Sequence, residues 1–144
     1  MNIKMQLFAT PEYLTDHGTP QTMDDFSSHR LICQHAGTAQ VAAGANLVAE
    51  LMTHDIPSTL TVNNYFGVLQ GVLNHLGIGV LPDYVTEDFP HLLRVLPEVE
   101  SGEVPVFLAY PEELRHSKRV AAFRDFVVEE IMTYRRRQQD DPSG

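Results

Sequence analysis

Apolar and polar positions change their spacing along residues 58–82, and the change predicts a strand, a helix and a second strand. Residues 58–62 (STLTV) are rich in the β-branched side chains that strands prefer. After Asn64, apolar residues recur every three or four positions, which predicts an amphipathic helix. These residues are Phe66, Leu69, Val72, Leu73 and Leu76. Residues 78–81 are wholly apolar, as in buried parallel strands, so we predict a strand–helix–strand crossover with Gly77 as the C-terminal cap of the helix.

The rest of the chain also alternates between strand-like and helix-like segments. Further strands are predicted at residues 3–9, 31–34, 92–96 and 105–110, with a strand or loop around 39–43. A short helix is predicted from Pro11 to about Gly18, with Thr10 as its N-cap. A long helix is predicted from Ser117 to about residue 137. Its expected buried stripe contains Val120, Phe123, Phe126 or Val127, Ile131 and Tyr134. This alternation is typical of α/β proteins.

Composition and charge exclude several classes of protein. The chain has 144 residues, enough for one domain or two small lobes. Its formal net charge of −9 argues against direct nucleic acid binding, because a phosphate footprint needs a concentrated basic face. Cys33 is the single cysteine, so an intrachain disulfide is impossible. No apolar run approaches the roughly 20 residues that span a bilayer, and no signal peptide is recognisable, which predicts a cytoplasmic protein without a membrane partner.

Two adjacent amides, Asn63 and Asn64, stand where the strand gives way to the helix. At such a corner the first N–H groups of the helix are unpaired and carry partial positive charge, which suits a small anionic or polar ligand. Tyr65 and Phe66 could supply an aromatic wall. Asn is also among the most favourable N-cap residues, so capping without a ligand is the alternative interpretation.

Two further residues are candidates for contact with a ligand. Thr10 stands at a second strand–helix corner, and it has the same two interpretations as the asparagines, with capping favoured. His35 follows the predicted strand at 31–34 and could face a cleft, although a solvated loop histidine is the simpler reading.

The sequence contains no recognisable catalytic, metal or cofactor motif. None of the seven histidines forms HExxH or HxH, and there is no GxSxG, phosphate loop or GxGxxG. The acidic pairs are adjacent in sequence, so on helices their side chains diverge. We therefore predict a protein that is not an enzyme and that uses no metal and no cofactor.

Four segments follow one another in a recognisable order. They are LFATPEYLTDHGTPQTMDDFSSHRLI, LTVNNYFGVLQGVLNHLGIGVLPDYV, LLRVLPE and VFLAYPEELRHSKRVAAFRDFVVEEI. Together they resemble the effector-binding domain of LysR-type transcriptional regulators. The resemblance covers most of residues 5–131, and it depends on the order and spacing of all four segments and not on any one motif.

The resemblance implies a fold like that of type 2 periplasmic binding proteins, in which crossover strands join two α/β lobes around an effector cleft. Residues 10–92 would form one complete lobe, the second of the family. Residues 1–9 and 93–144 would form crossover strands and the C-terminal part of the first lobe. The corner at Asn63 and Asn64 would face the cleft, cap its helix and contact a small effector, either a carboxylate or another small polar metabolite.

Family members also have a helix-turn-helix and the first part of lobe one, and neither pattern occurs in these residues. The resemblance thus implies a truncated regulator, either excised from a longer protein or encoded by a shortened reading frame. DNA contact would belong to the full-length protein, and intact members form homodimers or tetramers. Two alternatives stay open: a solute-binding protein of a transport system, and an inactive truncated remnant.

Overall fold

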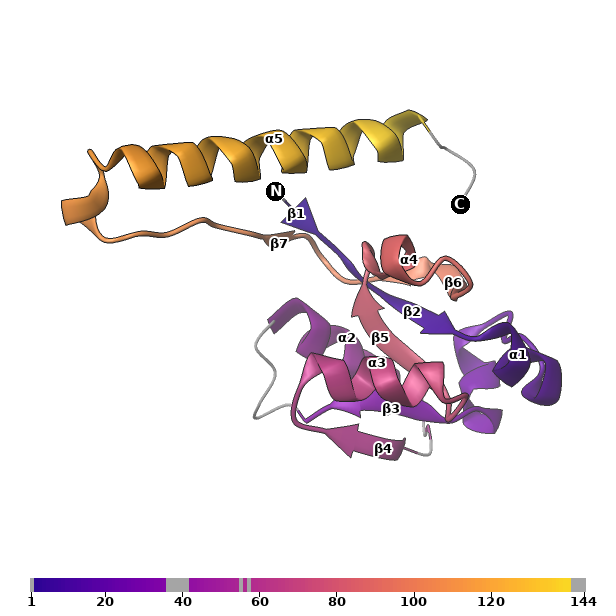
Figure 1. Cartoon of the computed structure of the whole chain (residues 1–144). Helices are drawn as coiled ribbons and strands as arrows, with labels where there is room; N and C mark the ends of the chain where they lie inside the picture. Colours follow the sequence, from indigo (N-terminus) through magenta and orange to yellow (C-terminus); the bar gives the residue numbers. More distant parts are fainter. Residues whose placement is uncertain (1, 36–41, 55, 57, 141–144) are drawn as a thin grey trace. The chain divides into compact units, whose positions relative to one another are not determined.

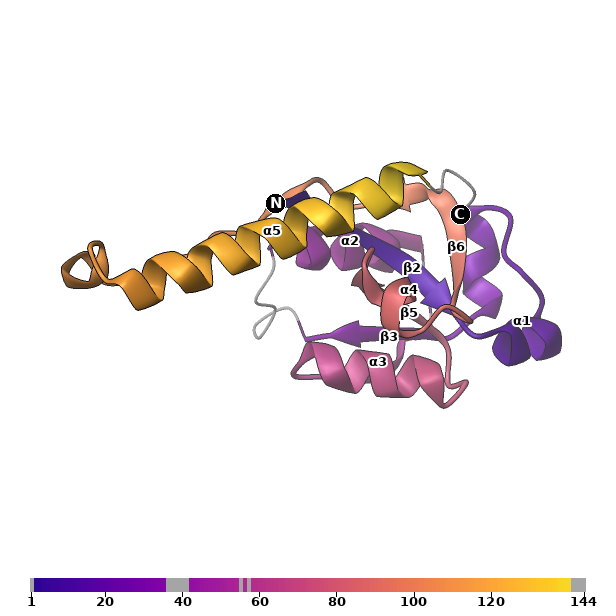
Figure 2. The same cartoon turned by 45° about the horizontal axis from the view of Figure 1, so that its top comes forward.

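A computed structural model describes residues 2–35, 42–54, 56 and 58–140, and the chain forms two compact units. The first unit is Asn2–Val104, and the second begins at Pro105. Figures 1 and 2 show the elements of each unit.

The elements follow the α/β order that the sequence predicts. The described strands are β1 (Asn2–Ile3), β2 (Met5–Ala9), β3 (Leu31–Gln34), β4 (Ser58–Val62), β5 (Ile78–Pro82), β6 (Leu93–Glu100) and β7 (Val104–Pro105). The described helices are α1 (Pro11–His17), α2 (Ala42–Leu51), α3 (Tyr65–Leu73), α4 (Val85–Asp88) and α5 (Lys118–Asp140). Short 3₁₀ helices are η1 (Met23–Ser28), η3 (Met52–His54) and η4 (Glu112–Leu114).

A five-stranded sheet in the order β4-β3-β5-β2-β6 forms the centre of the first unit. β3 is parallel to β4 and β5, whereas β2 is antiparallel to β5 and β6. Met5 therefore lies opposite Pro82 at the end of β5, and Ala9 lies opposite Leu93 at the start of β6. As a result β3, β4, β5 and β6 all end at one edge of the sheet, which we call the carboxyl edge, and β2 ends at the opposite edge.

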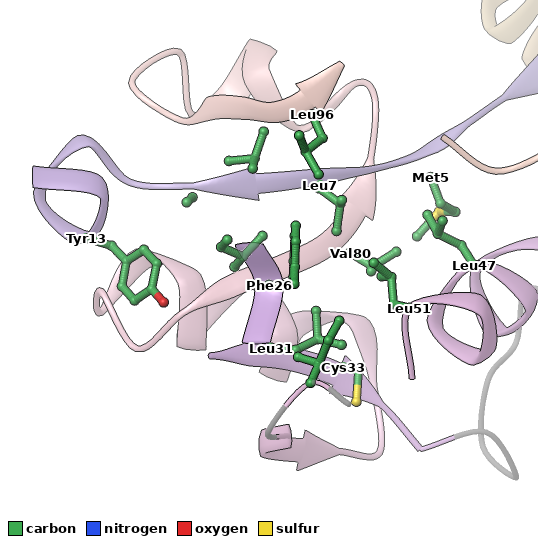
Figure 3. Close-up of a cluster of buried hydrophobic side chains, with 14 of the residues drawn as sticks. Met5, Leu7, Tyr13, Phe26, Leu31, Cys33, Leu47, Leu51, Val80 and Leu96 are labelled. Carbon is green, nitrogen blue, oxygen red and sulfur yellow. The ribbon is translucent and has the colours of Figure 1, made fainter. Parts of the chain in front are cut away.

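Helices cover both faces of this sheet, and each face has its own apolar core. Because side chains alternate along a strand, Leu7 faces one core and Phe8 faces the other. Figure 3 shows the first core, where Phe26 of η1 and Leu51 of α2 pack beside the sheet. The second core lies under α3, with Val72 fully buried. Each such side chain contributes about 1.5–3 kcal/mol when it is fully buried.

The first helix begins and ends as its sequence predicts. The Thr10 hydroxyl accepts a hydrogen bond from the Tyr13 N–H, and Pro11 occupies the first helical position. The helix ends at Gly18, whose φ of 84° is a conformation that favours glycine. Local chemistry alone therefore sets both ends of α1.

The end of α3 differs from the prediction. The helix ends at Leu73, and His75, with a φ of 60°, takes the left-handed conformation that we expected of Gly77. Gly77 is required for another reason, because a Cβ at this position would lie 2.4 Å from the Arg30 carbonyl oxygen. The predicted glycine cap is therefore wrong, and this glycine permits a close approach of two backbone segments.

Three other boundaries also differ from those predicted. The strand expected at 3–9 is two strands, interrupted at Lys4, and the strand expected at 105–110 is only the two-residue β7. Ala42 and Ala43 begin α2, so they are not in a strand or loop, while residues 39–41 lie outside the described residues.

The second unit contains the predicted long helix, α5, but not all of its predicted buried stripe. Half-buried positions, as expected, are Val120, Val127 (the alternative to Phe126), Ile131 and Tyr134. Phe123 and Phe126 are 57% and 60% exposed. The periodicity identified an apolar face, but within the described residues this unit has only η4 and an extended segment to cover it. Among the described residues, no helix is both long and apolar enough to cross a membrane.

Candidate functional site

The carboxyl edge of the sheet brings together several of the residues that the sequence identified. His35 directly follows β3, and its N–H donates to the Val62 carbonyl at the end of β4 (2.8 Å). The Gln34 side chain donates to the Asn63 carbonyl (3.2 Å). Asn63, Asn64 and His35 therefore lie on one edge, at the ends of adjacent parallel strands, where open α/β sheets bind ligands.

The two amides at this edge have different roles. Asn64 is the N-cap of α3, and its Oδ1 accepts a hydrogen bond from the Gly67 N–H (2.9 Å). Its Nδ2 donates to Oδ1 of Asn63 (2.7 Å). The Nδ2 group of Asn63 has no partner among the described residues, and the side chain is exposed. Capping therefore explains Asn64, whereas Asn63 presents an oriented donor to whatever occupies this edge.

Two aromatic residues begin α3 beside the amides. Tyr65 is half-buried against the second core, and its ring meets the Phe66 ring edge-on at a centroid distance of 5.3 Å. Phe66 belongs to the apolar stripe of the predicted helix, but its side chain is 72% exposed and is not part of the core. An exposed ring beside oriented amides can stack on a flat ligand.

A second tyrosine at this edge escaped the sequence reasoning. Tyr84 follows β5, and it lies within electrostatic range of Tyr65 and Asp88. Burial raises the pKa of Tyr84, and the nearby Asp83 and Asp88 carboxyls raise it further. Burial likewise raises the pKa of Tyr65. Both phenols therefore stay protonated and can donate hydrogen bonds. The position of Tyr84 directly after a buried strand was the sequence signal that could have identified this residue.

The structure does not bring Thr10 to the carboxyl edge. Because β2 is antiparallel to β5, Thr10 lies at the opposite edge of the sheet. It is fully buried, and its hydroxyl lies 2.7 Å from Nδ1 of His75 in addition to capping α1. Thr10 therefore stands apart from the asparagines, because the direction of β2 depends on pairing between segments far apart in the sequence, and its contact with a ligand stays a prediction.

Ion pairs hold several charged side chains at the carboxyl edge. The Lys4 ammonium, beside the start of β2, forms an ion pair with Glu100 at the end of β6. Glu100 also accepts from Arg94 (3.0 Å) and from Gln6 (3.2 Å). The first N–H groups of α3, next to Asn63, add partial positive charge at this edge. The described residues contain no cluster of three or more metal-ligating side chains.

Comparison with protein families and with known proteins relates this chain to transcriptional regulators. The family described as the LysR substrate binding domain matches residues 1–132. The chain is 28% identical over 131 residues to the uncharacterized HTH-type transcriptional regulator YhjC of Escherichia coli K12, covering 88% of this chain and 44% of that protein. It is 26% identical over 132 residues to the regulator CrgA of Neisseria meningitidis serogroup C, covering 89% and 44%. The chain thus spans less than half the length of these relatives.

Solved structures of regulators share its fold. The CrgA regulatory domain from Neisseria meningitidis has a TM-score of 0.66 at 24% identity, covering 90% of this chain and 65% of that chain. Full-length AphB, a virulence activator of Vibrio cholerae, has a TM-score of 0.65 at 20% identity, covering 90% and 46%. At these identities the likeness establishes the fold alone.

Proposed function

Since the chain belongs to the LysR substrate-binding domain family, we propose that its carboxyl edge around Asn63 holds the small molecule that controls a transcriptional regulator. The chain is the effector-binding domain of a LysR-type regulator, with the fold of type 2 periplasmic binding proteins. Asn63, Asn64, Tyr65, Phe66 and His35 form the ligand-contacting set, and Tyr84 joins them.

One observation carries this assignment. The Asn64 side chain bonds the Gly67 N–H and the Asn63 Oδ1, but the Nδ2 donor of Asn63 has no partner among the described residues. A donor whose side chain is already oriented, beside a helix N-terminus, needs little reorganisation when a ligand arrives. This geometry suits a carboxylate or another small polar metabolite, because both offer acceptor oxygens.

We assign the remaining features of the regulator by the same reasoning. Residues 10–92 form the second lobe, and residues 1–9 and 93–144 contribute crossover strands and part of the first lobe. DNA contact belongs to a helix-turn-helix region of the intact protein, which forms a homodimer or tetramer. A transcriptional regulator acts where its DNA is, so we place the protein in the cytoplasm. We assign it a binding function and no catalytic step.

Thermal unfolding with a panel of small carboxylates, amino acids and aromatic acids tests the binding function. A ligand that binds only the folded state raises its stability by about 2.7 kcal/mol at a hundredfold excess over Kd. We expect a saturable rise in Tm with one class of compound. A panel without any saturable response would contradict the assignment.

Two substitutions then locate the ligand. Asn63→Ala should abolish the rise in Tm while leaving the ligand-free Tm unchanged, because Asn64 provides the cap. Asn64→Asp keeps an acceptor for the Gly67 N–H and complements the helix dipole, so the fold is retained, but the added charge should weaken an anionic ligand. Gln70→Ala, on the exposed side of the same helix, is the matched control and should change neither quantity.

A further inference from the structure

An irregular segment joins the first two strands. β1 ends at Ile3 and β2 begins at Met5, so Lys4 belongs to neither. The N–H groups of Lys4 and Met5 donate to side-chain oxygens of Asp83 and Ser101. Side chains therefore hold the chain where the strand ladder is interrupted.

Asp83 and Ser101 hold this segment in the same way. Asp83 directly follows β5: its N–H donates to the Lys4 carbonyl (2.9 Å), and its Oδ2 accepts from the Lys4 N–H (3.2 Å). Ser101 directly follows β6: its N–H donates to the Met5 carbonyl (2.9 Å), and its buried Oγ accepts from the Met5 N–H (2.9 Å). Each residue thus holds one residue of the segment through one main-chain bond and one side-chain bond.

The choice of an acid at position 83 works against stability. Oδ1 of Asp83 is buried and has no hydrogen-bond partner among the described residues. Burial raises the pKa of this carboxyl, although the N–H groups of Lys4 and Tyr84 oppose the change. An asparagine could accept the same bond without a partly desolvated charge. The buried, unpartnered oxygen is therefore a local weak point in the bonding that holds this segment.

We propose that Asp83 and Ser101 form a side-chain latch on Lys4 and Met5, and that the latch opens when the regulator responds to its effector. This inference rests on the proposed function, since it assigns a conformational step to effector binding. Asp83 and Ser101 act as positioning residues, because they act through the backbone of the segment and touch no ligand. The latch lies directly beside Tyr84, one residue from the proposed site.

The main-chain bonds attach the segment to the sheet, and the side-chain bonds restrain its movement. If a side-chain oxygen rotates away, the bonds from the Asp83 and Ser101 N–H groups remain, so the segment stays attached to the sheet and can pivot. Gly102 follows Ser101, and a Cβ at that position would have no atom within 4 Å, so the backbone there has room to rotate. The Ser101 hydroxyl donates to the Gly102 carbonyl (2.7 Å) while its oxygen accepts from the Met5 N–H, so both bonds are present in the closed latch.

Amide hydrogen exchange on the full chain, without any ligand, tests the latch itself. We expect Ser101→Ala to accelerate exchange at Met5 about tenfold, because one hydrogen bond is lost, and Asp83→Ala to do the same at Lys4. Asp83→Asn should leave Lys4 unchanged, since the acceptor is retained. Ser27→Ala, which removes a serine hydroxyl bond to Asp24 elsewhere in this unit, is the matched control.

Two results would overturn the latch. Unchanged exchange at both Lys4 and Met5 would show that the side-chain bonds do not restrain the segment. Equal acceleration at Leu7 and Phe8, in the middle of β2, would show that the substitutions loosen the whole sheet.

A distance measurement tests the conformational role with the same variants. Nitroxide labels at Gln70→Cys and Glu129→Cys, both exposed, report on the two units in a Cys33→Ala background. Electron–electron resonance should show a broader distance distribution for Ser101→Ala than for Ser27→Ala. Identical distributions would refute the role of the latch in motion. No effector is present, so this failure is separate from a failure of the ligand panel.

Discussion

Gly77 is the position where a single methyl group should be most informative. The sequence suggests a helix cap, which would require a left-handed backbone, but the left-handed residue is His75. At Gly77 the constraint is contact, because the nearest atoms to an added Cβ are the Arg30 carbonyl oxygen at 2.4 Å and the Arg30 carbonyl carbon at 3.0 Å. Gly77→Ala must therefore displace one of two backbone segments.

The expected loss in the free energy of unfolding depends on which atoms the added methyl group displaces. Overpacking a buried site costs about 1–3 kcal/mol, and the upper half of that range applies because the obstacle is backbone and not a flexible side-chain end. The Arg30 carbonyl also accepts the Ile78 N–H (2.8 Å), and loss of that bond adds roughly 0.5–1.5 kcal/mol. We expect Gly77→Ala to lower the free energy of unfolding by about 2–4 kcal/mol.

Urea denaturation followed by circular dichroism measures this change. Gly102→Ala is the matched control, because its added Cβ would have no neighbour within 4 Å, and it should be neutral or stabilising by up to about 1 kcal/mol. A loss near 1 kcal/mol for Gly77→Ala would mean that the two backbone segments move apart easily. A loss below about 0.5 kcal/mol would refute the close approach of β5 and Arg30.

Other positions give further tests. His29 is buried, and burial together with the nearby His17 charge lowers the pKa of its side chain. The unfolded state therefore binds the proton more tightly, and the free energy of unfolding should fall as the pH drops below about 6.5. His29→Gln should flatten this pH dependence in urea titrations. Phe26→Ala should cost about 3–5 kcal/mol because Phe26 is fully buried, whereas Phe123→Ala, at an exposed position, should cost less than about 1 kcal/mol by the same method. The pKa of Asp83 is raised in the folded state, so this group stabilises the fold only at low pH and that contribution is lost as the pH rises; Asp83→Asn should therefore match or exceed the parent in Tm at pH 7.

The sequence by itself determined the features that depend on neighbours within a few residues. The cap at Thr10 and the stop at Gly18 were predictable, because a hydroxyl three residues from an unpaired N–H, or a glycine free to adopt a positive φ, acts locally. The β4–α3 corner was predictable for the same reason. The periodicity of α5 showed that a long helix was present, but not what covers it.

Only the tertiary structure decided which distant groups meet. The antiparallel direction of β2 moved Thr10 away from Asn63 and placed it against His75. The same pairing brought Lys4 beside Asp83, seventy-nine positions along the chain. Contacts of this kind depend on the register and order of strands, which no local pattern encodes, because each strand's apolar residues fit several neighbours equally well. The physical limit of the sequence is therefore the range of its interactions: it specifies the elements, and long-range pairing assembles the site.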